Sequence, residues 1–159
     1  MEEVMIVCAT RGGEASRAVE DFAIQLALEA NDEELVFFYV ADCDVLASTT
    51  DTRPHDINHD LTRLGEFIVI IAQERAQAAG LTNAHWIVRL GLVREEMISY
   101  LQGSGADRLV LGRPVGKGGD QVFSDRGLDQ FAMQIEAETG VKVLLADPTI
   151  GGGIDVTGK

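Results

Sequence analysis

The residues best suited to ligand chemistry form a glycine-rich segment, GRPVGKGG, which runs from Gly112 to Gly119. Glycine has no Cβ, so its backbone amide can approach a ligand closely, and Lys117 adds positive charge, as in a phosphate-binding loop. The P-loop spacing is absent, because a P-loop needs Ser or Thr after its Gly-Lys pair and Gly118 follows Lys117 here. The alternative is a merely flexible surface loop, and we favour it.

Two arginines are a second candidate, since Arg11 and Arg113 each follow a short apolar run. Guanidinium groups bind phosphates and carboxylates through paired hydrogen bonds, so the two would form a site for a small anionic ligand wherever they converge. The competing interpretation pairs Arg11 with Asp42 or Asp44, which follow the next apolar run. We favour this ion pair, because an arginine beside acidic loop residues more often binds them than a ligand.

Histidines and cysteines give weaker candidates. His55 and His59 have the spacing of two metal ligands on one helical turn, but solvated imidazoles at the start of a helix explain them better. His85 is expected to be an outward or hydrogen-bonded strand residue. Cys8 lies in an apolar run, where a packed thiol is expected, and the aspartates beside Cys43 discourage thiolate chemistry. For these reasons we expect no metal site. No serine lies in a Gly-x-Ser-x-Gly elbow, and we expect no enzyme activity.

These residues are carried by alternating apolar runs and amphipathic segments, which predict buried strands and helices. The expected strands are residues 4–9, 35–40, 84–90, 108–112 and 141–145. The expected helices are residues 15–30, 57–79 and 91–101, and a fourth that Ser124 caps and Thr139-Gly140 ends. Long crossovers favour parallel strands, so the sequence predicts a single-domain α/β fold with an open five-stranded parallel sheet and helices on both faces.

The helical spacing also predicts which faces contact the sheet. In the first helix the inward face includes Val19, Phe22, Ala23 and Leu26, and Glu20 lies outside it. The inward stripe expected for the second helix is Leu61, Leu64, Ile68, Ile71, Ala72 and Arg75.

Composition and charge limit the partners. A chain of 159 residues, 46% hydrophobic and 25% charged, suits one folded domain. The net charge of -13 repels nucleic acid and anionic membrane surfaces. The longest apolar run, residues 67–72, is too short to span a membrane, and the N-terminal Met-Glu-Glu lacks the charge of a signal peptide, so we expect a cytosolic protein.

Three stretches resemble the universal stress protein family: IVCATRGGEASRAVEDFAIQLA, GLVREEMISYLQGSGADRLVLGR and IEAETGVKVLLAD. The resemblance covers residues 4–147, so we expect one such domain over residues 1–147 and a glycine-rich tail over 148–159. We expect this tail to be mobile unless a partner holds it, because it has little to bury. The resemblance implies a Rossmann-like, adenine nucleotide alpha hydrolase-like fold with strand order 3-2-1-4-5. It also implies a stress-response role and, in many members, bound ATP or AMP.

The resemblance further implies a homodimer through the fifth strand. An unpaired apolar edge strand is a liability that such pairing removes. The residues expected to carry this contact are Val141, Val143 and Leu145, which alternate with Lys142 and Leu144.

The nucleotide site implied by the resemblance has two departures from the family pattern. Members that bind nucleotide carry an Asp just after the first strand, where this chain has Arg11. After the fourth strand they carry Gly, two residues, Gly, nine residues, then Gly and a hydroxyl residue. Gly116 and Gly119 match the first spacing, but Asp129 stands where the third glycine belongs, and the nearest glycine, Gly127, precedes Leu128.

We therefore expect a cytosolic stress-response protein in which adenine-nucleotide binding is weakened, altered or lost. The family order makes the strands before Arg11 and Arg113 neighbours, so the anionic-ligand site would lie between them. A genuine ATP or AMP binder with at most weak hydrolysis is one alternative, and an interaction module that regulates a transporter or another partner is a second. The residues of a family-type site would be Ala9, Thr10, Arg11, Val40, Gly112, Arg113, Gly116, Gly119 and Gly127.

Overall fold

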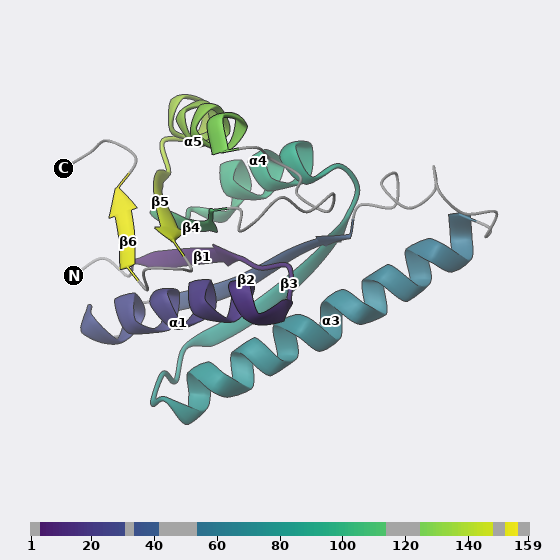
Figure 1. Ribbon diagram of the computed structural model, residues 1–159, viewed down its shortest axis with the longest axis horizontal. Coiled ribbons are helices and arrows are strands. Elements are labelled where there is room, and N and C mark those ends of the chain that lie inside the picture. The colour runs from purple at the N-terminus through teal and green to yellow at the C-terminus, as the bar shows by residue number, and fades with distance from the viewer. Residues whose placement is uncertain (1–3, 31–33, 42–53, 114–124, 148–151, 156–159) are drawn as a thin grey trace.

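The computed structural model describes residues 4–30, 34–41, 54–113, 125–147 and 152–155, which form one sheet flanked by helices (Figure 1). The strand order is β3-β2-β1-β4-β5-β6, and the first five strands are parallel. This confirms the predicted order 3-2-1-4-5. The strands are β1 (Met5–Ala9), β2 (Glu34–Ala41), β3 (Ala84–Leu90), β4 (Arg108–Gly112), β5 (Lys142–Asp147) and β6 (Gly152–Asp155).

Helices cover both faces of the sheet, as predicted. Helices α1 (Gly13–Glu29) and α3 (Pro54–Ala78) pack on one face, and α4 (Val93–Ser104) and α5 (Asp125–Thr139) on the other (Figure 1). Each layer has its own hydrophobic core, because alternate residues of a strand point to opposite faces. None of the described helices is long and apolar enough to cross a membrane.

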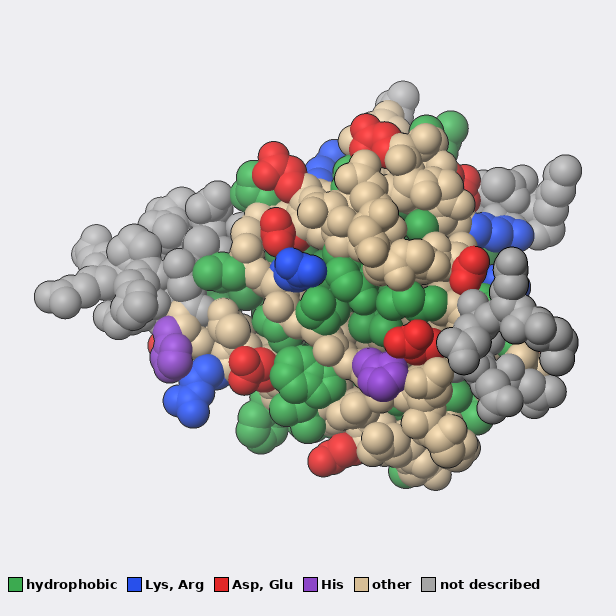
Figure 2. All heavy atoms as spheres, turned by 180° about the vertical axis from the view of Figure 1, so that it is seen from behind, with side chains coloured by type: hydrophobic (Ala, Val, Ile, Leu, Met, Phe, Trp, Pro, Cys, Tyr) green, Lys and Arg blue, Asp and Glu red, His purple; other side chains and the backbone are tan. Residues whose placement is uncertain are grey.

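The sheet has an edge at β3, where large apolar side chains reach the surface. Trp86 is 37% exposed and Leu90 is 46% exposed. Figure 2 shows hydrophobic side chains in the middle of the face that is turned away in Figure 1, with charged side chains around them. His85 lies on this strand, is exposed, and has its Nε2 2.8 Å from Asn83 Oδ1, which confirms the expected structural role.

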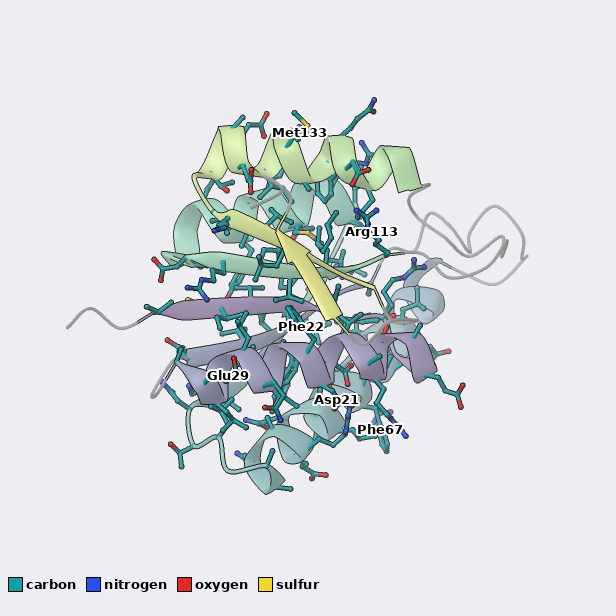
Figure 3. All side chains as sticks on the ribbon, turned by 60° about the vertical axis from the view of Figure 1, so that its left-hand side comes forward. Asp21, Phe22, Glu29, Phe67, Arg113 and Met133 are labelled. Atoms are coloured by element: carbon teal, nitrogen blue, oxygen red, sulfur yellow. The ribbon has the colours of Figure 1, made fainter. Side chains whose placement is uncertain are left out.

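The inward stripe predicted for helix α3 is correct for Ala72 and wrong for Leu64 and Ile71. Val69, Ala72 and Ala76 are fully buried, whereas Leu64 and Ile71 are 53% and 42% exposed. The sequence could not select the face, because apolar residues lie on more than one side of this helix. The structure buries the side with small residues, which lets the helix approach the sheet closely. Phe67, also exposed, lies on the α1 and α3 layer at the side opposite α5 (Figure 3).

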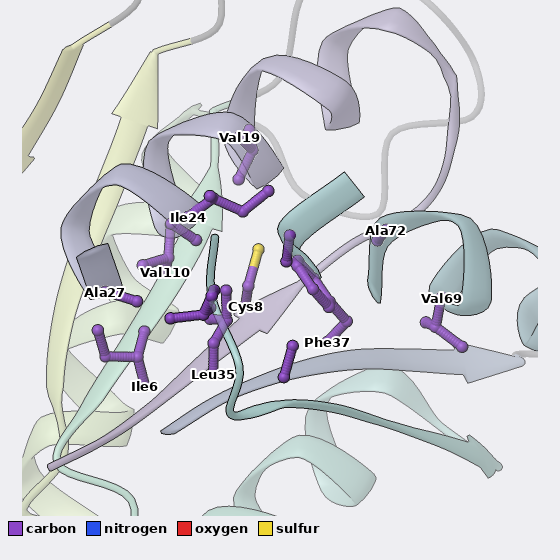
Figure 4. Packing of buried hydrophobic residues seen from close by; sticks show 14 of the residues in the cluster. Ile6, Cys8, Val19, Ile24, Ala27, Leu35, Phe37, Val69, Ala72 and Val110 are labelled. Atoms are coloured by element: carbon purple, nitrogen blue, oxygen red, sulfur yellow. The ribbon is translucent and has the colours of Figure 1, made fainter. Parts of the chain in front are cut away.

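The core between the sheet and the α1 and α3 layer contains the first cysteine. Cys8 is fully buried, and its sulfur points into a cluster with Val110, Leu35 and Phe37 around it (Figure 4). Burial raises the pKa of the Cys8 thiol well above its ordinary value, and the nearby Glu20 carboxylate raises it further. This confirms the expectation of a packed thiol. Cys43 lies outside the described residues.

Part of the C-terminal tail, which was expected to be mobile unless a partner holds it, forms a strand of the sheet. Residues 152–155 form β6, which pairs antiparallel with β5. The prediction considered only what side chains of the tail could bury, but strand pairing needs only backbone donors and acceptors, and β5 offers an edge of them. The edge of β5 that was expected to pair with a second copy is therefore covered within the chain.

Candidate functional site

The strand order reverses between β1 and β4, which is where ligands bind in open parallel sheets. Cys8 on β1 lies opposite Val110 on β4. Arg11 and Arg113 each follow this pair by three residues, so the chain brings them to the same end of neighbouring strands. The backbone N–H of Arg113 donates to the carbonyl oxygen of Ala146 over 2.9 Å, which holds it beside β5.

Thr10 ends β1 and is tied to a buried acid. Its backbone N–H continues the ladder to Phe38 O over 2.9 Å, and its hydroxyl donates a hydrogen bond to Glu20 Oε2. Thr10 is 3% exposed and Glu20 is 5% exposed. The expectation that Glu20 lies off the packed face of α1 is therefore wrong. A buried carboxylate is stable only with hydrogen bonds or an opposite charge, and Thr10 supplies the first.

Arg75 on α3 supplies the charge. Its Nη1 donates to Glu20 Oε1 over 2.8 Å, and its Nη2 donates to Asp21. Burial raises the pKa of the Glu20 carboxyl, while the Thr10 hydrogen bond and the Arg75 charge oppose that rise. The result is a clamp, formed by Thr10, Glu20, Arg75 and Asp21, that joins the end of β1 to α1 and α3.

Arg11 follows Thr10 of the clamp and is exposed. Its backbone N–H donates to Ser16 Oγ over 3.1 Å, which fixes the turn into α1. Burial raises the pKa of the Tyr39 phenol, and the Arg11 charge opposes that rise, so the guanidinium acts on this ring. The predicted partners Asp42 and Asp44 lie outside the described residues, so that pairing stays a prediction.

Close packing around this end of the sheet depends on glycines. A Cβ at Gly65 of α3 would lie 2.6 Å from Tyr39 Cε1, and a Cβ at Gly12 would lie 2.8 Å from Ile68 Cδ1. Helix α3 therefore packs closely against Tyr39 of β2 and against Gly12, which follows β1. Gly12 also has φ 83°, a left-handed conformation that favours glycine.

Gly112, predicted as a ligand-contacting residue at the end of β4, has a packing role in this structure. A Cβ at this position would lie 2.6 Å from Cγ2 of Val19, so only glycine lets α1 lie this close to β4. This contact explains the glycine without a ligand.

Arg113 forms an ion pair with the acid that breaks the family motif. Its Nη2 lies 3.3 Å from Oδ1 of Asp129 on α5, and the two side chains are 27% and 49% exposed. Figure 3 shows Arg113 at the end of the sheet where α5 begins. Arg113 is therefore engaged with a carboxylate of the chain itself. The anionic ligand that Arg113 and Arg11 were predicted to share stays a prediction.

The other predicted residues divide into two groups. Ala9 and Val40 are half-buried at the ends of β1 and β2, and Gly127 is half-buried on α5. Their role in binding stays a prediction. The loop residues Gly116, Gly119 and Lys117 and the helix cap Ser124 lie outside the described residues, as does the side chain of His55. His59 is exposed, and across the ranges given above no three His, Cys, Asp or Glu side chains gather as metal ligands would.

The clamp was missed by sequence reasoning. Glu20 is one polar residue within an apolar helical face, and Arg75 is 55 residues away along the chain. A signal was present, because the inward stripe proposed for the second helix included Arg75, and a cation on an inward stripe needs a buried partner.

The chain is similar to known proteins both in sequence and in fold. The Universal stress protein family profile matches residues 5–125. A universal stress protein crystallised in complex with cAMP is 23% identical, with a TM-score of 0.61, over 90% of this chain and 96% of that chain. A universal stress family protein from Burkholderia pseudomallei is 20% identical, with a TM-score of 0.62, over 89% and 94%. One from Arabidopsis thaliana with AMP bound is 11% identical, with a TM-score of 0.61, over 91% of each chain. No curated protein sequence matches significantly.

Proposed function

Because the chain belongs to the universal stress protein family, we propose that it is a cytosolic stress-response regulator whose adenine-nucleotide site is weakened, altered or lost. The observation that carries this proposal is the ion pair between Arg113 and Asp129. Asp129 stands where nucleotide-binding members have a glycine, so a carboxylate occupies the position from which a glycine amide would approach phosphate.

Charge decides the effect on a nucleotide. A carboxylate repels phosphate oxygens, and a guanidinium engaged with that carboxylate is less available to them. At the other side of the site Arg11 replaces the family's Asp, so the group that would accept hydrogen bonds from a nucleoside becomes a donor. Both changes disfavour the family pose, and neither requires a change of fold.

The structural neighbours support the scaffold for this proposal. Two of them were crystallised with cAMP and with AMP, so folds of this kind hold adenine nucleotides. The proposal assigns this chain a binding and regulatory role rather than catalysis.

The test is calorimetric titration of ATP and AMP into the purified chain and into Arg11→Asp and Asp129→Gly variants. We expect weak or no binding by the unmodified chain and at least a ten-fold gain in ATP affinity for Asp129→Gly. Arg63→Asp, on the exposed side of α3, makes the same charge change as Arg11→Asp and serves as the control. Nucleotide that co-purifies with the unmodified chain, together with variants that gain nothing, would instead establish a genuine ATP or AMP binder.

A second candidate, an interaction module, is favoured by the exposed apolar row on α3. Leu64, Phe67 and Ile71 are 53%, 68% and 42% exposed and lie one turn apart. The Phe67→Asp variant should lose specific cross-links to a partner in cells while keeping its melting temperature. Met133→Asp is the matched control, because Met133 is 63% exposed on the opposite helical layer (Figure 3). Equal cross-linking by both variants would remove this candidate.

The proposal includes a homodimer through β5, which the family resemblance implies. Two features of the structure change how such a dimer would form. Val141, Val143 and Leu145 are at most 2% exposed, so their side chains pack within the protomer and leave only the strand backbone for pairing. In addition, β6 lies on that backbone edge.

A further inference from the structure

The outer edge of β5 is covered by the C-terminal strand of the same chain. Strand β6 pairs antiparallel with β5 in a register that places Leu144 opposite Asp155 and Asp147 opposite Gly152 (Figure 1). On its other side β5 pairs with β4 from Lys142 to Ala146, which is all of the strand except its last residue. Strand β5 is therefore held in the sheet by β4, whereas β6 is the outermost strand and pairs with β5 alone.

The sequence of β6 indicates that its pairing with β5 is weak. The strand has four residues, Gly-Gly-Ile-Asp, and two of these have no side chain to pack. Glycine in a strand also loses more conformational entropy on ordering than other residues, by about 0.5–1 kcal/mol relative to alanine. The pairing of β6 therefore depends mainly on backbone hydrogen bonds, which any other strand can supply.

A second copy of β5 is a suitable replacement. The strand has six residues, Lys-Val-Leu-Leu-Ala-Asp, and is longer and more apolar than β6. It carries a positive residue at one end, Lys142, and a negative residue at the other, Asp147. Antiparallel pairing about a two-fold axis sets these unlike ends of the two copies near each other, and the same strand serves on both sides.

We propose that β6 is a removable edge strand that controls self-association: while residues 152–155 lie on β5 the edge is closed, and their release lets β5 pair with β5 of a second copy. This inference rests on the homodimer in the proposed function and adds its control. Only four residues separate the two strands in sequence, so β6 competes at an effective concentration in the millimolar range. At micromolar protein the closed monomer should therefore prevail.

The test compares three full-length proteins by analytical ultracentrifugation over a concentration series. Gly153→Pro with Ile154→Pro removes two successive backbone N–H groups from β6, so that whichever one faces β5 is lost. Thr157→Pro with Gly158→Pro, beyond β6, is the control. We expect the unmodified chain and the control to be monomers at micromolar concentration, and the β6 variant to dimerise with at least a ten-fold lower dissociation constant.

Hydrogen exchange then locates the contact. In the β6 variant the amides of β5 should be protected at high concentration and lose protection on dilution. In the unmodified chain the amides of residues 152–155 should be protected at low concentration and become less so as concentration rises.

Each other outcome overturns the inference. A dimeric unmodified chain that the β6 variant converts to a monomer would mean that β6 makes the dimer by strand exchange. Equal dimerisation of all three proteins, with residues 152–155 of the unmodified chain and of the control protected at every concentration, would place the contact elsewhere on the protein and would remove both the pairing through β5 and its control by β6. Monomers throughout would remove the homodimer as well. The nucleotide part of the proposed function is tested separately by titration and is unaffected by either result.

Discussion

Replacing Arg75 with alanine removes the cation that faces the buried carboxylate of Glu20. The Arg75 Nη1 to Glu20 Oε1 bond is 2.8 Å long, and hydrogen bonds to charged groups contribute about 1.5–3 kcal/mol. The second bond, to the 60% exposed Asp21 side chain, adds little because solvent screens it. Since the Arg75 side chain is itself 27% exposed, the lower half of the range applies. We expect the free energy of unfolding to fall by about 2 kcal/mol, which corresponds to roughly 4–8 °C in melting temperature.

The size of this loss should depend on pH. Burial raises the pKa of Glu20, and Arg75 is one of the groups that oppose the rise, so the variant should have a still higher pKa. A carboxyl group whose pKa is higher in the folded than in the unfolded state contributes most to the stability of the fold below its unfolded-state pKa. This contribution is lost as the pH rises through its folded-state pKa. The variant should therefore lose little stability at acidic pH, where Glu20 is protonated, and progressively more as the pH rises from acidic to neutral and above.

Urea unfolding followed by circular dichroism across that pH range measures both effects. Arg63→Ala is the control, because it removes the same type of charge from an exposed position on the same helix. Adding Glu20→Gln to Arg75→Ala should recover part of the loss at neutral pH, since an amide needs no counter-charge. A loss below about 0.5 kcal/mol, or one that is equal at every pH, would refute the reasoning about the clamp.

Three smaller predictions follow from packing. Gly65→Ala should destabilise the protein by about 1–3 kcal/mol in urea unfolding, because the added Cβ would meet the Tyr39 ring. Gly103→Ala, with open space around it, should instead stabilise α4, and equal effects of the two substitutions would argue against the contact between Gly65 and Tyr39. Gly105→Ala should cost about 1–2 kcal/mol, because this residue ends α4 with φ 76°, and an unchanged melting temperature would contradict it. Cys8 should resist alkylation in the native protein, as mapped by mass spectrometry, because it is buried and its pKa is raised; rapid labelling without unfolding would count against this packing.

The strands and their order were predictable because their signals are local. A strand that is covered on both faces is largely an apolar run, and β4, whose three central residues are buried, begins and ends at the predicted residues 108 and 112. Glycines after the helices gave their ends equally well, since Gly80 has φ 107° after α3. Long connections then left parallel pairing as the simplest arrangement.

The errors concern features that depend on distant residues. The buried face of α3 is set by how closely the helix can approach β2. Gly65 permits a close approach because it has no Cβ that would collide with Tyr39, and Tyr39 is distant from it in the sequence. Glu20 is buried because Thr10 and Arg75 satisfy it, and neither is adjacent to it on the helix. A hydrophobic periodicity contains no information about such partners, so the pattern placed Glu20 outside.

The departure from the family motif after β4 has two linked effects, and this link yields a final prediction. Asp129 both removes the glycine and supplies the carboxylate that Arg113 contacts at 3.3 Å. Asp129→Gly therefore removes a repulsive charge and also releases Arg113 from that contact. Both changes should raise the affinity for a phosphate ligand. Arg113→Ala alone removes a cation and leaves the carboxylate, so it should gain nothing. Titration of ATP into both variants and the double variant should show that most of the gain from Asp129→Gly disappears without Arg113, and additive effects would mean that the pair does not act as a unit.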